Sequence, residues 1–421
     1  MTANNRLSSV LLWSVISAAF IGPGTVTTAA SAGALFKLDL LWAVVFSTIA
    51  CIVLQEVSAR LAIVSGLPMG KAMIQRYGER KGAWLNFFLG GPVILGCAAY
   101  QAGNIVGAVS GLQLMTSATI FTLTPLLALV VALILWTDRR QTIGWLMTFL
   151  VAIMGVAFAA LAFNRPPEFT EVVRSSLVPR IPPGSELLAL GLVGTTIVPY
   201  NVFLGSGVSK GQTVPLMRVG LTISVIIGGL ITAFILVAGT SVSSFRDFRE
   251  LSDALHAALG PVGAWALGTG LFAAGFSSAI TSPYAASMIA STVFGWGKAA
   301  QRWTWAVVLL TGFLVGMSGL KPIPVILLVQ ALNGLVLPLL TAFLILLIND
   351  EGLINREHRP SVYYNVVLLL IFACVMVLGL HSIDKSVSSW LDAPQGHYPV
   401  IMAITFLFTG TLVFRVFRHR S

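Results

Sequence analysis

Two apolar segments of this chain are interrupted by proline, with small or polar residues beside it. The residues at these interruptions are Gly22, Pro23, Gly24 and Thr25 in the first segment and Thr196, Val198, Pro199, Tyr200 and Asn201 in the second. Because proline cannot continue the hydrogen bonds of a helix, each interruption frees backbone carbonyls. Carbonyl, hydroxyl and amide oxygens are hard ligands of the kind that magnesium and calcium prefer. These residues could therefore bind a cation or another small polar substrate.

The composition indicates what surrounds these interruptions. The chain has 421 residues, of which 57% are hydrophobic and 10% charged, whereas about a quarter of the residues of a soluble protein are charged. Apolar runs of about twenty residues are long enough to cross a bilayer as helices. The sequence predicts about twelve such helices, over residues 8–36, 40–65, 86–114, 116–136, 141–163, 184–208, 215–242, 261–292, 303–320, 322–348, 362–381 and 398–416. We therefore expect an all-α polytopic membrane protein.

The two interruptions open corresponding halves of the chain. In a bilayer a broken helix persists only where protein or a polar cavity satisfies its free backbone groups, and paired breaks of this kind mark the substrate sites of many transporters. Five helices precede the polar stretch 164–184, so two five-helix repeats of inverted topology are predicted, with helices 1 and 6 unwound. The expected division is residues 1–163 for the first repeat, 164–184 for an extracytoplasmic linker, 185–348 for the second repeat and 349–421 for two additional helices and a basic cytoplasmic tail.

The basic residues predict the orientation. With the N-terminus inside, seventeen of the 25 Lys and Arg residues fall on the inner side, and cytoplasmic loops carry such an excess. We therefore expect both termini in the cytoplasm of a cell with a bacterial-type cytoplasmic (inner) membrane. The net charge of +10 follows from this topology and from contact with anionic lipid, so nucleic acid is not an expected partner. The expected partners are the lipid bilayer and a small ion or solute; the sequence specifies no oligomeric state, and a monomer is consistent with it.

Three stretches resemble a known family, the natural resistance-associated macrophage protein (NRAMP) transporters. LQEVSARLAIVSG (54–66) is similar to the second-helix signature of that family, AAGFSSAITSPYA (273–285) to its eighth helix and VQALNGLVLPL (329–339) to its tenth. The resemblance implies a leucine-transporter-type fold with a 5+5 inverted repeat, and transport of divalent metal cations by alternating access.

The two interruptions are the places where this chain departs from that family. The family's first-helix motif Asp-Pro-Gly-Asn aligns with residues 22–25, so Gly22 replaces its carboxylate ligand. The sixth-helix motif Met-Pro-His-Asn aligns with residues 198–201, so Val198 and Tyr200 replace its methionine and histidine. Third-helix acids that resemble a proton route align with Gln101 and Asn104. The resemblance thus implies a divergent NRAMP member that lacks the usual metal-ligand side chains and classical proton coupling.

The ligands that remain are neutral. A divalent cation, such as hydrated Mg²⁺ or Mn²⁺, would be held by the backbone carbonyls of Gly22, Gly24 and Ile197 together with Gln330, which aligns with a family glutamine near the metal; the amide of Asn333 is a further candidate. Magnesium binds proteins through few direct contacts and keeps several waters. Without a carboxylate to offset dehydration, we expect weak affinity.

Two further groups of side chains have a structural as well as a functional interpretation. Ser277, Ser278 and Thr281 on the eighth helix could hold sodium against first-helix carbonyls, but Ser and Thr also pack helices in membranes. Glu56 and Arg60 lie four residues apart, which predicts a structural ion pair rather than a proton relay. No combination of nucleophile, acid and base indicates an enzyme, and no cofactor is expected.

Two alternatives to metal transport remain open. A neutral site between half-helices also suits a small organic solute or anion, because helix N-termini attract carboxylates and unwound carbonyls hold cations. Such an amino-acid-like carrier would work with or without sodium coupling. A non-transporting sensor is the third interpretation.

Overall fold

The computed structural model describes residues 3–137, 139–164, 166–242, 247–320, 336–391 and 396–418, and these residues form helices without a β-strand. The helices are α1 (Ala3–Phe20), α2 (Pro23–Phe36), α3 (Leu41–Ser65), α4 (Met69–Tyr77), α5 (Glu79–Met115), α6 (Ile120–Trp136), α7 (Arg140–Asn164), α8 (Phe169–Leu177), α9 (Glu186–Thr196), α10 (Pro199–Val208), α11 (Val214–Gly239), α12 (Phe248–Leu259), α13 (Pro261–Thr292), α14 (Lys298–Met317), an unlabelled helix Val336–Ile348, the 3₁₀ turn η1 (Arg356–His358), α16 (Val362–Leu391) and α17 (Tyr398–Arg418). Each predicted span coincides with one of these helices or with a broken pair in its described part; of the span 322–348, the structure describes residues 336–348.

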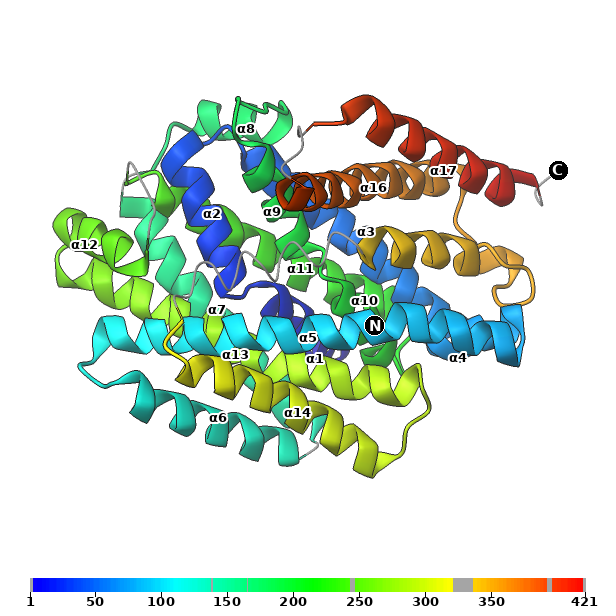
Figure 1. Cartoon of the computed structure of the whole chain (residues 1–421), viewed down its shortest axis with the longest axis horizontal. Coiled ribbons are helices and arrows are strands. Elements are labelled where there is room, and N and C mark those ends of the chain that lie inside the picture. Colours follow the sequence, from blue (N-terminus) through cyan, green and yellow to red (C-terminus); the bar gives the residue numbers. More distant parts are fainter. Residues whose placement is uncertain are drawn as a thin grey trace.

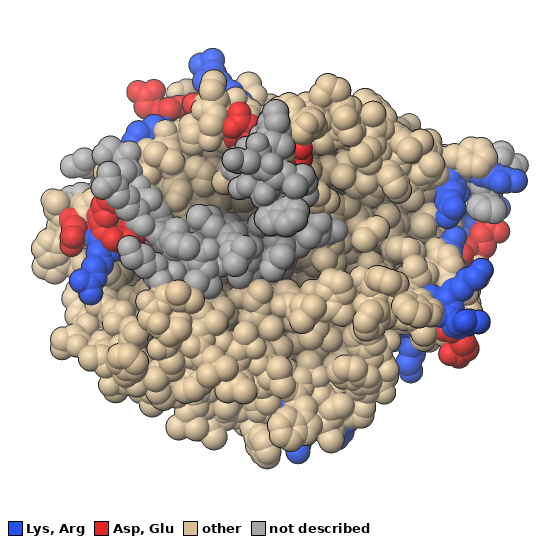
Figure 2. Space-filling view, viewed as in Figure 1, with Lys and Arg blue, Asp and Glu red and all other residues tan. Residues whose placement is uncertain are grey.

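Length and composition support a membrane location. Among the described residues, eight helices are long and apolar enough to cross a bilayer, and the bent pair α1–α2 makes a ninth. Two shorter apolar helices, 120–136 and 336–348, accompany them. In Figure 1 the long helices run roughly side by side, with α8 and α12 toward one end of the molecule and α4 and the C-terminal end of α17 toward the other. On the face shown in Figure 2, charged side chains gather mainly toward these two ends, and a broad band without charge lies between them.

Both predicted helix breaks are present. α1 ends at Phe20 and α2 begins at Pro23, with a bend of 63° between them. α9 ends at Thr196 and α10 begins at Pro199, and together they form one candidate span of 23 residues. In each case proline occupies the first turn of the second half-helix, where its missing N–H costs no hydrogen bond. The sequence pattern thus specifies where each helix stops and restarts.

Glycines bring neighbouring helices into close contact. A Cβ on Gly275 of α13 would overlap the backbone of Ala108 on α5, and a Cβ on Gly239 of α11 would overlap the backbone of Ala30 on α2. Small residues allow such close approach between helices in membranes. Because α2 and α11 belong to different predicted repeats, this packing joins the two halves next to the first break.

The predicted linker 164–184 contains a helix that the sequence analysis did not predict. α8 is nine residues long, and Phe169, Val173 and Leu177, which are four residues apart, are all exposed. A short helix with an exposed apolar stripe suits the surface of a bilayer. Because proline residues lie on both sides of α8, the sequence does not indicate a helix here.

Candidate substrate site at the two helix breaks

The carbonyls that the first break frees at the end of α1 accept hydrogen bonds from hydroxyl groups. The carbonyl oxygen of Ala18 accepts from Ser277 Oγ at 3.2 Å and Ser278 Oγ at 3.3 Å. The carbonyl oxygen of Phe20 accepts from the hydroxyl of Thr25. A helix C-terminus carries a partial negative charge, and here neutral donors satisfy it. The two serines of the predicted sodium site therefore face the first helix. Their hydroxyls donate to the carbonyl of Ala18, which is one of the first-helix carbonyls expected to help hold sodium.

Tyr200 joins the two breaks. Its phenolic O–H donates to the carbonyl oxygen of Ala19 at 2.8 Å, so the first turn of α10 is bonded directly to the last turn of α1. The ring meets Tyr100 of α5 edge-on, with ring centroids 5.7 Å apart. The position at which the family carries a histidine thus contributes a bridge between the two broken helices.

The surroundings of Gly22 explain what a side chain there would touch. A Cβ at this position would lie 2.9 Å from Ser278 Oγ and 3.6 Å from Asn104 Oδ1. The first break therefore lies next to both Ser278 of α13 and Asn104 of α5. The carbonyl of Gly22 accepts the N–H of Val26 at 3.1 Å, and Gly24 lies within α2. These two predicted carbonyl ligands are thus part of the first turns of α2.

Other predicted ligands are engaged within their own helices. Thr196 Oγ1 donates to the carbonyl of Leu192 at 3.0 Å, and Thr281 Oγ1 donates to that of Ser278 at 3.4 Å. The predicted ligands Gln330 and Asn333 lie outside the described residues.

Three buried amides at the centre of the molecule retain unused hydrogen-bonding capacity. Asn201 is fully buried, and neither Nδ2 nor Oδ1 has a partner in the described part of the chain. Asn104 Nδ2 and Gln101 Oε1 are also unpartnered, although Gln101 Nε2 donates to the carbonyl of Ala279 at 2.9 Å. An unsatisfied buried polar atom costs about 1–3 kcal/mol. A polar ligand or its hydration water would recover that free energy.

The structure adds Gln55 to this set. Gln55 is buried, its Oε1 is unpartnered, and that oxygen occupies the space that a Cβ on Gly205 would need. Gly205 lies one turn after Asn201 on α10. The sequence analysis quoted Gln55 only as part of LQEVSARLAIVSG; an amide within an apolar span was the signal that could have identified it.

A cavity of about 510 Å³ lies beside the second break. Tyr100, Pro199 and Tyr200 line it together with apolar side chains such as Phe88 and Leu339. Apart from the tyrosines, its wall offers few polar contacts. It suits an organic group better than a bare cation.

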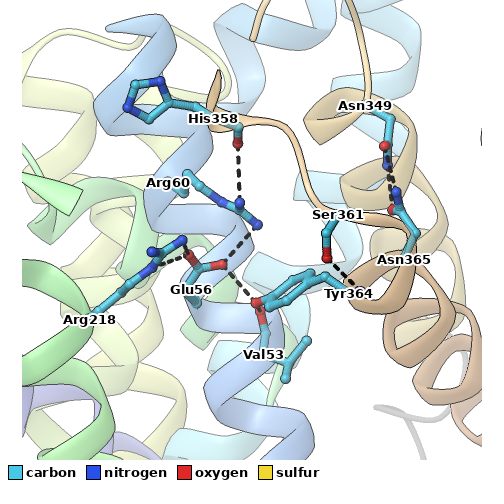
Figure 3. A network of polar contacts seen from close by, with 9 residues as sticks. All are labelled: Val53, Glu56, Arg60, Arg218, Asn349, His358, Ser361, Tyr364 and Asn365. Atoms are coloured by element: carbon cyan, nitrogen blue, oxygen red, sulfur yellow. Dashed lines mark hydrogen bonds and ion pairs between the residues drawn. The ribbon is translucent and has the colours of Figure 1, made fainter. Parts of the chain in front are cut away.

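A charged network lies away from the breaks and is centred on Glu56 (Figure 3). Its carboxylate bonds Arg60 Nη2 at 3.1 Å and Arg218 Nε at 2.9 Å, and it accepts the phenolic O–H of Tyr364 at 2.8 Å. Arg60 also donates to the carbonyl of His358 at 3.1 Å. Glu56 and Arg60 are the charged residues among the buried side chains of the described ranges. The sequence analysis identified this pair but missed Arg218 and Tyr364.

The described part of the chain contains no metal site built from His, Cys, Asp and Glu side chains. No group of three or more His, Cys, Asp and Glu side chains could hold a metal ion there. A metal at the breaks would therefore depend on neutral oxygen ligands, the type that suits magnesium and calcium better than thiophilic metals.

Comparison with known proteins decides the family. The model of the family "Natural resistance-associated macrophage protein-like" matches residues 14–383. The chain belongs to this family. Among NRAMP relatives, it is 24% identical to the divalent metal cation transporter MntH of Caldanaerobacter subterraneus over 87% of this chain and 90% of the relative. It is 23% identical to the divalent metal cation transporter MntH of Erwinia tasmaniensis, over 90% and 95% of the two chains.

Solved structures show the same NRAMP fold. A crystal structure of a manganese transporter variant from Eremococcus coleocola matches with a TM-score of 0.78 at 20% identity, covering 98% of this chain and 93% of that one. The same transporter in complex with an aromatic bis-isothiourea substituted compound matches with a TM-score of 0.77. The predicted all-α, leucine-transporter-type architecture is thereby confirmed.

Proposed function

We propose that this chain is a membrane transporter that moves a divalent cation, Mg²⁺ or Mn²⁺, past the two helix breaks. Its NRAMP membership supports transport, and relatives bear the names of divalent metal and manganese transporters. The observation that carries the proposal is Asn201, a fully buried amide beside the second break with both polar atoms unpartnered in the described structure. Such a group gains free energy when a cation or its water binds.

The neutral ligand set favours a hydrated ion. Asn201 Oδ1 can bind a metal directly or accept a hydrogen bond from a metal-bound water. A backbone carbonyl such as that of Gly22 keeps a second lone pair beside the hydrogen bond that it accepts within α2. Magnesium gives up its waters reluctantly, and residues 20–25 and 196–201 include no carboxylate that would offset that cost. We therefore expect millimolar affinity and little selection for transition metals.

We also propose that transport proceeds by alternating access without classical proton coupling. Gln101 and Asn104 do not titrate, and Glu56 is held by two arginines and a tyrosine. A proton-driven carrier needs a titratable group available within the membrane. Gln101, Asn104 and Glu56 therefore supply no available titratable group.

The topology forms part of the same proposal. Both termini lie in the cytoplasm of a cell with a bacterial-type cytoplasmic membrane, and the chain contains two five-helix repeats. The end of the molecule that carries α4 and the last turn of α17 is then cytoplasmic. Arg415 and Arg418 in that turn agree with the excess of basic residues on the inner side.

A second function is favoured by the cavity at Tyr100 and Tyr200. Its volume of about 510 Å³ and its largely apolar wall suit a small organic solute whose polar end would bond the Tyr100 hydroxyl, which has no partner among the described residues. Under this alternative, metal ions would neither bind nor be transported.

One experiment separates the two functions. Purified protein in liposomes is assayed for uptake of Mg²⁺, Mn²⁺ and Ca²⁺ and of a panel of amino and organic acids, with and without a pH gradient. The proposal is supported if metal uptake saturates at millimolar concentration and its rate does not change with the pH gradient. Uptake of an organic acid without any metal flux would support the second function instead. Acceleration of metal uptake by an inward proton gradient would contradict transport without proton coupling.

A further inference from the structure

A second candidate site lies along the C-terminal half of α17 and shares no lining residue with the helix breaks. It is a groove of about 840 Å³, lined by residues of α17 and by Arg76 of α4. It combines basic and apolar side chains, chiefly Arg76, Arg415, Arg418, Phe406, Leu407 and Phe414. No part of the proposed transport site contributes to it.

The residues of α17 that line the groove form a continuous stripe. Its lining residues 407, 411, 414, 415 and 418 recur at intervals of three and four, so they share one face of the helix. Gly410 leaves a gap in this stripe, because a Cβ there would meet no atom within 4 Å. Phe406, Leu407 and Phe414 are each more than 60% exposed, as expected for side chains that face acyl chains.

The basic end of the groove has more positive than negative charge. Arg76 is held by Asp350 Oδ2 at 2.7 Å and by the carbonyl of Leu346. Arg415 is exposed and pairs with no acidic side chain of the described residues. The guanidinium of Arg418 lies 5.5 Å from the ring centroid of Phe414, at the point where the apolar part of α17 ends. Asp350 therefore neutralises Arg76, whereas Arg415 has no acidic partner among the described residues.

We propose that this groove binds an anionic glycerophospholipid. The phosphate lies against Arg415 and Arg418, and an acyl chain follows Phe406 and Leu407 past Gly410. Arginine suits phosphate because its planar fork donates two hydrogen bonds at once. Basic pockets on the cytoplasmic side of membrane helices bind anionic lipid headgroups in this way. The apolar wall favours a lipid over a free anion, because a free anion would leave that wall unused.

Lipid binding to the full-length protein tests this site. Native mass spectrometry measures binding of phosphatidylglycerol and phosphatidylcholine by the wild type and by three variants. Arg415→Gln with Arg418→Gln removes the headgroup contacts, and Gly410→Phe fills the apolar gap while every charge is kept. Arg80→Gln with Lys81→Gln is the matched control, since both residues are exposed and lie outside the groove.

We expect the arginine pair variant to bind phosphatidylglycerol about thirtyfold more weakly, at roughly 1 kcal/mol per basic residue. Gly410→Phe should also weaken binding, and the control should match the wild type. Equal losses in the arginine pair variant and the control, with no effect of Gly410→Phe, would show diffuse surface charge and overturn the proposal. Binding of inorganic phosphate as tightly as the lipid would equally overturn it.

Discussion

The polar groups around Glu56 and those around Asn201 differ in one respect that bears on function. The Glu56 carboxylate is fully engaged: two arginines and a tyrosine hold it, and they come from α3, α11 and α16, although Arg60 Nε has no hydrogen-bond partner among the described residues. Around Asn201 the groups are neutral, equally buried and unpartnered among the described residues. The comparison indicates that charge in this protein holds helices together, whereas unused neutral amides are available to a substrate.

The largest expected effect comes from breaking the charged network. Glu56→Gln removes the carboxylate and leaves Arg60, whose side chain is 5% exposed, as a buried charge that keeps the carbonyl of His358 and the ring of Tyr364 but has no counter-charge. Loss of one member of such a pair costs about 3–5 kcal/mol. Thermal unfolding in detergent should show a large drop in Tm, and adding Arg60→Met should recover part of it.

An exposed ion pair serves as the control for Glu56. Glu351 pairs with Arg359 at 2.6 Å but is 61% exposed, and such pairs contribute about 0–1 kcal/mol. Glu351→Gln should leave Tm almost unchanged. Equal shifts for the two variants would refute the structural role of the buried network.

The next effect separates stability from transport within the buried amides. Asn201→Leu removes no hydrogen bond within the described structure, so Tm should stay the same or rise while uptake is lost. Asn365 is also fully buried but exchanges two amide hydrogen bonds with Asn349, at 2.9 and 3.0 Å. Asn365→Leu should lower stability by about 1–3 kcal/mol and leave uptake intact. The opposite pattern would reverse our interpretation of the two regions.

A third change would convert the neutral site into a metal site of the family type. Gly22 is extended, with φ −108° and ψ −178°, and caps α2, so aspartate suits its backbone. Among the described residues, Ser278 Oγ is the atom that comes closer than 3 Å to the new Cβ, at 2.9 Å. We expect Gly22→Asp with Val198→Met and Ser278→Ala to bind Mn²⁺ at least tenfold more tightly, about 1.4 kcal/mol, by calorimetry.

Ser278→Ala alone is the control for that variant and should not change Mn²⁺ affinity. If the triple variant gains none either, the alignment of residues 22–25 with the family motif is wrong.

The smallest effect concerns the bridge between the breaks. Tyr200→Phe removes the hydrogen bond to the carbonyl of Ala19 and should cost about 1 kcal/mol. Tyr363→Phe, at a residue that is 86% exposed, should cost nothing measurable. Identical Tm values for the two variants would show that the bridge contributes no stability.

Local features of the fold could be predicted from the sequence. Pro23 and Pro199 act on their own helices, so both breaks were predicted correctly. The partners of Glu56 could not be predicted, because Arg218 and Tyr364 lie 162 and 308 residues away along the chain. Gln55 was missed for the same reason, since Gly205 makes room for it from another helix. The resemblance to the family implies which ligands are replaced, whereas packing shows which amides have no partner among the described residues.

The most direct test of a neutral divalent-cation site is uptake of Mn²⁺ and Mg²⁺ by the wild type and Asn201→Leu, measured side by side in liposomes with equal amounts of incorporated protein. The account predicts saturable uptake at millimolar concentration by the wild type and a rate near that of empty liposomes for the variant. Equal metal uptake by the two proteins, or no metal uptake by the wild type, would contradict it.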